Sequence, residues 1–221
     1  PEIQSFKNKR AMLSSLYQKI YLGDICARNN IKNDRVLNIL IKKMAESVKQ
    51  PLSYNRLKNV IVATGSPISV PTTIDYVDYA SDSWLILPME NEVGKLTEKE
   101  MQKKYYFVDN GLLNLFLMNS ETSLLENLVA VELCRRFGKK NVFFLNAEKE
   151  IDFIVPDEKL AIQVSYSIKD ETTYNREVPP LVKYAKAYEN WKCLLITYDE
   201  EGTEEGIPVV PVWKWLMRDG L

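Results

Sequence analysis

The 221-residue chain contains no histidine, only three cysteines and only eight glycines. The absence of histidine excludes serine and cysteine triads of the usual kind, zinc-peptidase motifs and imidazole general bases. Cys26, Cys134 and Cys193 are too widely spaced for a disulfide framework or a CxxC metal site, and we expect them to be small buried hydrophobes. None of the glycines lies in a GxxxxGK[ST] frame, which excludes a phosphate-binding loop. Any catalysis by this chain would therefore depend on carboxylates, lysine or a hard metal ion.

Long apolar runs are also missing. No run approaches the roughly 20 residues that cross a bilayer, and no basic stretch followed by an apolar one resembles a signal peptide. With 46% hydrophobic and 27% charged residues the composition is that of a globular protein, and we expect it to be cytoplasmic. The chain opens at Pro1 without an initiator methionine, so we expect a larger protein to have been cut.

Charge is distributed unevenly along the chain, although the net charge is only −1. Residues 1–62 carry twelve Lys and Arg against four Asp and Glu, an excess of eight positive charges. Residues 111–221 carry thirteen against eighteen, an excess of five negative charges. The two ends are therefore predicted to face different partners or each other.

Apolar spacing in residues 33–110 predicts three helices and a two-stranded wing. The first helix begins at Asn33 or Asp34, and a second is capped by Ser53. A third begins near Ser69, and the runs WLILP and KKYYFVD after it are able to pair as a hairpin. This order is that of a winged helix-turn-helix domain, but it is equally that of a small helical packing module.

The predicted third helix carries Asp75, Asp78 and Asp82 and no Lys or Arg. A nucleic-acid reader needs cations where this helix meets phosphates, so we do not expect it to read sequence in a groove. The earlier basic side chains indicate an ordinary solvated face, a patch for an acidic partner, or sequence-independent DNA binding. These side chains are Arg35, Lys42, Lys43, Lys49, Arg56 and Lys58.

From residue 111 onward the pattern changes to alternating helices and strands. A helix is predicted from Leu124 to Phe137, stopped by Gly138. The β-like runs NVFFLN, EIDFIVP and LAIQVSY follow, then an amphipathic helix, the strand CLLITYD and a final VVPVWKWLM segment. The order α-β-β-β-α-β predicts a mixed sheet flanked by helices, an α+β or α/β fold.

Polar residues at alternate positions of two of these strands define a candidate site. Gln163 and Ser165 project from one side of LAIQVSY, and Asp152 lies beside Gln163 if the two strands pair. A buried Asp requires a partner. We expect a hydrogen-bonded polar cluster, completed by Arg176 or Lys169, rather than a metal site.

The run from LLENLVAVEL through EIDFIV to IQVSY resembles the PD-(D/E)XK nuclease-like domain at the C-terminal end of many prokaryotic AAA-type ATPases. YLGDICARNNIKN, TTYNREVPPL and VPVWKWL are also similar to that family, and the similarity covers nearly the whole chain. It implies that residues 1–32 are a linker from a missing ATPase domain. Residues 33–110 would then form a winged-helix domain, and residues 111–221 a nuclease-like α/β domain.

The resemblance places Glu126 at the helix acid, Asp152 at the strand acid, Gln163 at the second strand acid and Ser165 at the lysine. An active enzyme of this class holds Mg²⁺ through the carboxylates and uses the lysine to stabilise developing charge. Gln163 and Ser165 supply neither charge, and losing one such positioned contact typically costs about a hundredfold in rate. Asp152 and Gln163 are thus weak metal candidates, and Glu126 also fits a capping box with Ser123.

The leading hypothesis from the sequence is an interaction or regulatory region of an ATPase, carrying a pseudo-nuclease. Its expected partners are the missing N-terminal ATPase domain, which would bind ATP and Mg²⁺, and another protein, with no membrane involved. The alternative is a DNA or RNA endonuclease that uses Mg²⁺ or Mn²⁺ with Glu126 and Asp152.

Overall fold

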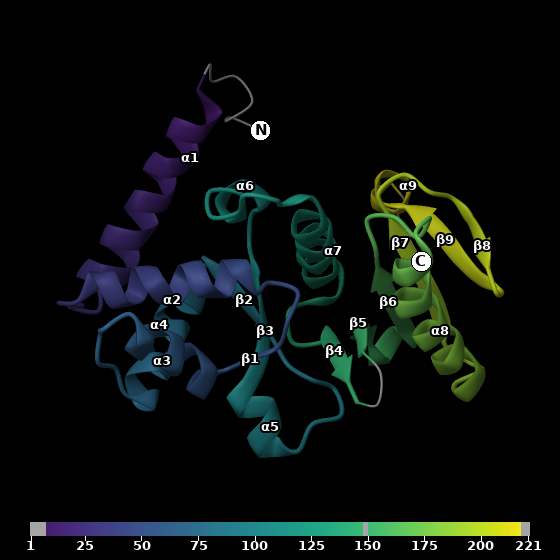
Figure 1. The fold of residues 1–221 in the computed structure, drawn as a ribbon, viewed down its shortest axis with the longest axis horizontal. Coiled ribbons are helices and arrows are strands. Elements are labelled where there is room, and N and C mark those ends of the chain that lie inside the picture. The colour runs from purple at the N-terminus through teal and green to yellow at the C-terminus, as the bar shows by residue number, and fades with distance from the viewer. Residues whose placement is uncertain (1–7, 148–149, 218–221) are drawn as a thin grey trace. The chain divides into compact units, whose positions relative to one another are not determined.

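The computed structural model describes residues 8–147 and 150–217 and has a mixed α/β fold (Figure 1). This confirms the general fold class expected from the sequence. Residues 1–7 of the predicted linker, and residues 148–149 and 218–221 of the predicted nuclease-like domain, lie outside the described residues. The chain divides into two compact units. The first unit comprises Pro1–Pro88 and Met101–Ser120, and the second comprises Met89–Glu100 and Glu121–Leu221.

Helices dominate the first unit, and their starts follow local capping chemistry. The Ser53 hydroxyl accepts a hydrogen bond from the Arg56 N–H, and that of Ser69 accepts one from the Thr72 N–H, each at 3.2 Å. The predicted cap at Ser53 and the predicted helix start near Ser69 are both confirmed. The elements are α1 (Lys9–Gln18), the π-helix η2 (Lys19–Ala27), α2 (Asp34–Glu46), β1 (Leu52–Ser53), α3 (Tyr54–Ala63), α4 (Val70–Asp82), β2 (Ile86–Met89), β3 (Gln102–Phe107) and α6 (Asn110–Leu113).

A three-stranded sheet of order β1-β3-β2 completes this part of the chain. The predicted pairing of β2 with β3 is confirmed. Between these two strands the chain forms α5 (Leu96–Met101), where the sequence predicted a charged loop. The two-residue strand β1, antiparallel to β3, was not predicted because so short a segment shows no periodicity.

Much of the predicted linker is helical, as α1 and η2. Tyr17 stacks on Tyr21 with ring centroids 5.5 Å apart and meets Phe116 edge-on at 5.1 Å. Burial of these rings fixes α1 to α6 and its neighbourhood within the first unit. The end of α1 and η2 therefore pack into the core, whereas most of α1 is exposed.

The second unit is a six-stranded mixed sheet with helices against it, as predicted. The strand order is β4-β5-β6-β7-β9-β8, with β5 antiparallel to β6, and β6, β7 and β9 mutually parallel. The short strand β8 was not predicted. The elements are α7 (Glu121–Phe137), β4 (Phe143–Asn146), β5 (Glu150–Val155), the 3₁₀ turn η3 (Pro156–Glu158), β6 (Leu160–Val164), α8 (Glu171–Ala187), β7 (Lys192–Thr197), β8 (Gly202–Glu204), β9 (Ile207–Pro211) and α9 (Val212–Leu216).

The start of α7 was predicted wrongly. The helix begins at Glu121, so Ser123 lies inside its first turn and does not cap it, and the capping-box interpretation of Glu126 is incorrect. An acidic residue in the first turn complements the helix dipole, which allows the polar ETS segment to be helical. The predicted end is confirmed, since Phe137 is the last helical residue and Gly138 adopts φ +82°.

Helix α8 covers one face of the sheet through an apolar stripe. Val178, Leu181 and Val182 are buried against Ile154 and Leu195 of the strands. The covering helix also fixes which of its polar side chains face the strands. No helix within the described ranges is long and apolar enough to cross a bilayer.

Candidate functional site

Asp152 and Gln163 lie side by side on the antiparallel strands β5 and β6, as the alternation of their side chains predicted. They are only 6% and 5% exposed. The Asp152 N–H donates to Gln163 Oε1 at 3.2 Å, and Asp152 Oδ2 accepts from the Val164 N–H at 2.9 Å. Side chains thus take part in the hydrogen bonding between the two strands.

Helix α8 contributes a second carboxylate, from Glu177. Gln163 Nε2 donates to Glu177 Oε2 at 2.5 Å, and Arg176 Nε donates to Glu177 Oε1 at 2.7 Å. Burial raises the pKa of Glu177, and the nearby Asp152 carboxylate raises it further. The hydrogen bonds from Gln163 and Arg176 lower this pKa in part, because they favour the charged form. We call Asp152, Gln163, Glu177 and Arg176 the polar cluster.

Sequence reasoning anticipated Arg176 in this cluster but missed Glu177, through which Arg176 acts. A usable signal was present. Glu177 precedes Leu181 by four residues and therefore lies on the same helix face as that buried leucine. A carboxylate on the apolar face of a covering helix is placed against the sheet.

Ser165 and Lys169 occupy the turn that leaves β6. The Ser165 hydroxyl donates to the Ser167 carbonyl at 2.9 Å, and its N–H donates to the Ile196 carbonyl at 3.0 Å. Lys169 takes part through its backbone N–H, which donates to Ser167 Oγ at 3.3 Å. These bonds hold the turn.

Glu126 is buried on α7, which packs against β6. The structure therefore places all four predicted site residues in the second unit, with Asp152 and Gln163 in direct contact. The fourth, Ser165, bonds through its hydroxyl within its own turn and through its N–H to β7.

The oxygen atoms of the cluster fit a divalent cation poorly. Magnesium requires oxygen ligands directed at one point in near-octahedral geometry. Here Asp152 Oδ2 and Gln163 Oε1 each accept a backbone N–H, and both Glu177 oxygens accept side-chain donors. Within residues 8–147 and 150–217, no group of three or more Cys, Asp or Glu side chains is arranged to hold a metal.

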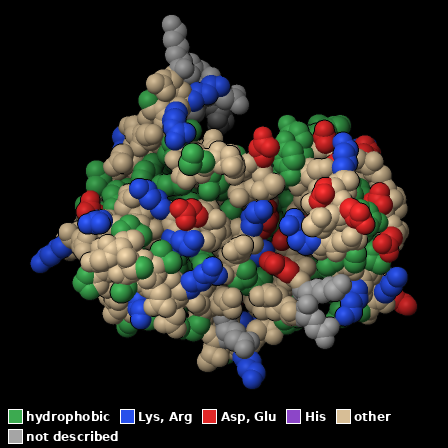
Figure 2. All heavy atoms as spheres, viewed as in Figure 1, with side chains coloured by type: hydrophobic (Ala, Val, Ile, Leu, Met, Phe, Trp, Pro, Cys, Tyr) green, Lys and Arg blue, Asp and Glu red, His purple; other side chains and the backbone are tan. Residues whose placement is uncertain are grey.

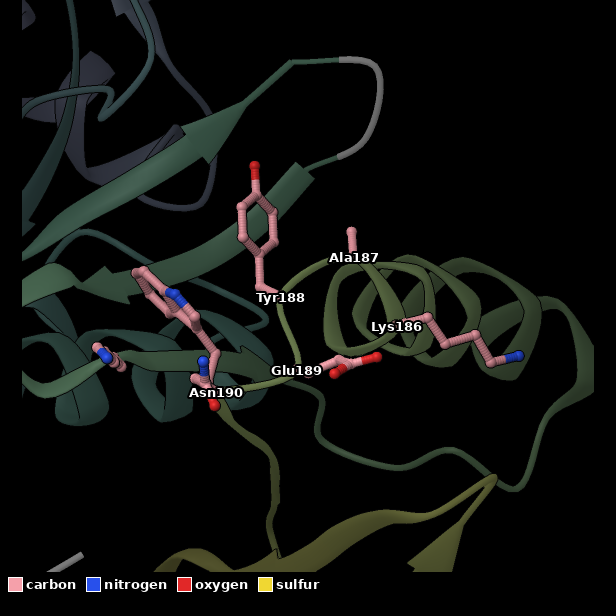
Figure 3. A pocket seen from close by; sticks show the side chains of 7 residues that line it. Lys186, Ala187, Tyr188, Glu189 and Asn190 are labelled. Carbon is pink, nitrogen blue, oxygen red and sulfur yellow. The ribbon is translucent and has the colours of Figure 1, made fainter.

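A separate hollow of about 430 Å³ lies where α8 ends. Figure 3 shows Lys186 and Glu189 extending to one side of this turn, while Tyr188 points away from them. With Lys159 the lining holds two cations and one anion, an excess of one positive charge. The lining residues are Lys159, Lys186, Ala187, Tyr188, Glu189, Asn190 and Trp191, which include no member of the polar cluster.

Comparison with known proteins gives a family for this chain. It is 30% identical over 223 residues to an uncharacterized protein of Methanocaldococcus jannaschii, covering 94% of this chain and 50% of that protein. It is 30% identical over 218 residues to an uncharacterized protein of Haemophilus influenzae, covering 95% of this chain and 53% of that protein. The chain thus spans about half the length of the curated relatives it matches.

No solved structure matches the chain significantly. The family model described as "Domain of unknown function (DUF8612)" matches residues 1–123, more than half of the sequence. The chain belongs to this family.

Proposed function

We propose that this chain is the interaction region of a cytoplasmic AAA-type ATPase and that its nuclease-like fold has lost phosphodiester chemistry. The observation that carries the proposal is the internal hydrogen bonding of the polar cluster. Gln163 uses both ends of its amide, accepting from the Asp152 N–H and donating to Glu177. A Gln163 amide that is bonded at both ends stabilises the fold, and these bonds already fix its orientation toward Asp152 and Glu177 rather than toward a metal ion.

The architecture of each unit supports the wider proposal. Helices α2, α3 and α4 followed by the β2–β3 pair have the element order of a winged helix. Helix α7, strands β4 to β6, the α8 crossover and β7 have the order expected of the nuclease-like fold. The relatives are about twice as long as the region they share with this chain, which leaves room for an ATPase domain in such proteins.

A cleavage assay tests the loss of chemistry. The whole chain is incubated with plasmid, single-stranded DNA and RNA in Mg²⁺ or Mn²⁺, beside the Asp152→Asn variant. We expect wild type and variant to be equally inactive. Metal-dependent cutting by the wild type that disappears in Asp152→Asn, but persists in the exposed control Asp157→Asn, would overturn the proposal.

A second candidate, a metal-dependent endonuclease, is favoured by one specific observation. The two charges missing at Gln163 and Ser165 have counterparts on α8, where Glu177 offers a carboxylate and Arg176 a guanidinium. This role requires the Gln163 amide to release its partners. It predicts that cutting is lost in Glu177→Gln as well as in Asp152→Asn, which separates it from a contaminating nuclease.

A further inference from the structure

Two tyrosines form an open aromatic surface at the carboxyl ends of the parallel strands β6 and β7. Tyr166 follows β6 and Tyr198 follows β7, and their rings stack with centroids 4.7 Å apart and planes 14° apart. The Tyr198 N–H donates to the Tyr166 carbonyl at 3.3 Å, which extends the strand pairing and fixes both rings. Tyr198 nevertheless remains 50% exposed.

Two carboxylates lie near this pair. Glu121 and Asp199 lie close enough to the Tyr166 hydroxyl that, after the contribution of burial, their charges raise its pKa. Both are exposed. We call Tyr166, Tyr198, Glu121 and Asp199 the tyrosine face.

Neighbouring charges do not reverse the sign of this surface. Glu200 accepts hydrogen bonds from the Ser167 hydroxyl and the Ile168 N–H and so braces the turn after Tyr166. Glu201 forms an ion pair with Lys214. Lys169 is a cation in the turn that follows Tyr166. Figure 2 shows acidic side chains gathered over the region of β8 and β9.

The chemistry of the partner follows from the exposed aromatic pair and from the negative charge around it. An exposed aromatic pair can stack against a base or a planar cation, but carboxylates repel the phosphates of nucleic acids and the headgroups of anionic membranes. A guanidinium or ammonium group is attracted both by the ring faces and by the carboxylates. The charge of the surroundings therefore decides in favour of a cation.

We infer that the tyrosine face docks an arginine- or lysine-bearing segment of a partner protein. The inference deepens the proposed interaction role and rests on it, because it names the surface and the chemistry of the partner. The rings are held in place before binding, so little ordering is required of this side of the interface.

The binding test uses a short synthetic arginine–glycine peptide, titrated calorimetrically into the whole chain at low ionic strength. We expect saturable binding that weakens about fivefold in Tyr198→Ala, the effect of an exposed cation–π contact. It should weaken about twofold in Asp199→Asn and persist in Tyr198→Phe, which keeps the ring.

Matched controls come from the same unit. Tyr188 is also 50% exposed, and Glu189 follows it in the chain as Asp199 follows Tyr198. Binding should be unchanged in Tyr188→Ala and Glu189→Gln. Equal weakening in the control variants, absence of saturable binding, or tighter binding of a single-stranded oligonucleotide than of the peptide would each overturn the inference. Those outcomes leave the proposed loss of nuclease chemistry intact, which fails only on metal-dependent cutting.

Discussion

Gln163 and Tyr166 lie three residues apart on β6 and its exit turn, yet their surroundings differ completely. Gln163 is buried and bonded at both ends of its amide, whereas Tyr166 belongs to a partly open aromatic pair. The first arrangement satisfies its polar groups internally and the second leaves ring surface in water. We therefore propose that binding occurs where the strand ends and that the interior position, which resembles a catalytic centre, serves stability.

The largest expected effect is on the stability of the buried polar cluster. Asp152→Ala removes the acceptor of the buried Val164 N–H and a neighbour of Gln163. We expect it to lower the unfolding free energy by about 3 kcal/mol, because an unpaired buried donor adds its desolvation penalty to the lost bond. Urea unfolding followed by tryptophan fluorescence measures the change. The exposed control Asp157→Ala should stay within about 0.5 kcal/mol, and equal effects of the two variants would contradict a structural role.

The cluster should also make stability depend on pH through Glu177. Its pKa is raised in the folded state, so the folded protein binds more protons than the unfolded chain between the ordinary pKa of 4.5 and the raised value. Stability from this group is complete below 4.5 and is lost as the pH rises through the raised pKa. Glu177→Gln should abolish this decline in unfolding experiments across the acidic range. Parallel curves of unfolding free energy against pH for the wild type and Glu177→Gln would count against this role of Glu177.

The pKa of Glu132 is lowered, whereas that of Glu177 is raised, so the stability from Glu132 changes with pH in the opposite direction. Hydrogen bonds from Arg135 lower its pKa to about 2, with Arg136 adding to the effect against the contribution of burial. Its stabilisation is therefore present above 4.5 and lost as the pH falls through about 2. We expect Glu132→Gln to lower the unfolding free energy by about 1 kcal/mol at neutral pH and by nothing at the acid extreme. An effect that is constant with pH would contradict this ion pair.

The last prediction concerns the turn that sets Asp152 opposite Gln163. Lys159, between β5 and β6, adopts φ +48°, a left-handed conformation that strains any residue with a β-carbon. Lys159→Gly should therefore be more stable than Lys159→Ala by about 1 kcal/mol, since both lose the same long side chain. Equal thermal midpoints would show that the turn carries no such strain.

Sequence reasoning predicted the parts of this fold that depend on local patterns. Alternation along β5 and β6 was enough to bring Asp152 beside Gln163, and the Ser53 cap and the start near Ser69 identified two helices. The strands β1 and β8 were missed because two or three residues show no periodicity. The helical spacing of Glu177 and Leu181 indicates that Glu177 faces the sheet, but its pairing with Gln163 depends on where α8 crosses the sheet, which local patterns do not encode.

The exposed tyrosine pair was missed for a related reason. Tyr166 and Tyr198 belong to separate strands, and only the parallel pairing of β6 with β7 stacks their rings. Each residue alone has the sequence context of an ordinary strand end. Tertiary pairing thus creates a surface that no single segment predicts.

The central claim is that the polar cluster is closed to metal ions, and calorimetric titration of Mg²⁺ and Mn²⁺ tests it most directly. We predict no saturable heat that distinguishes the wild type from Asp152→Asn. Tight binding of one ion by the wild type, absent from Asp152→Asn and retained by Asp157→Asn, would contradict the claim.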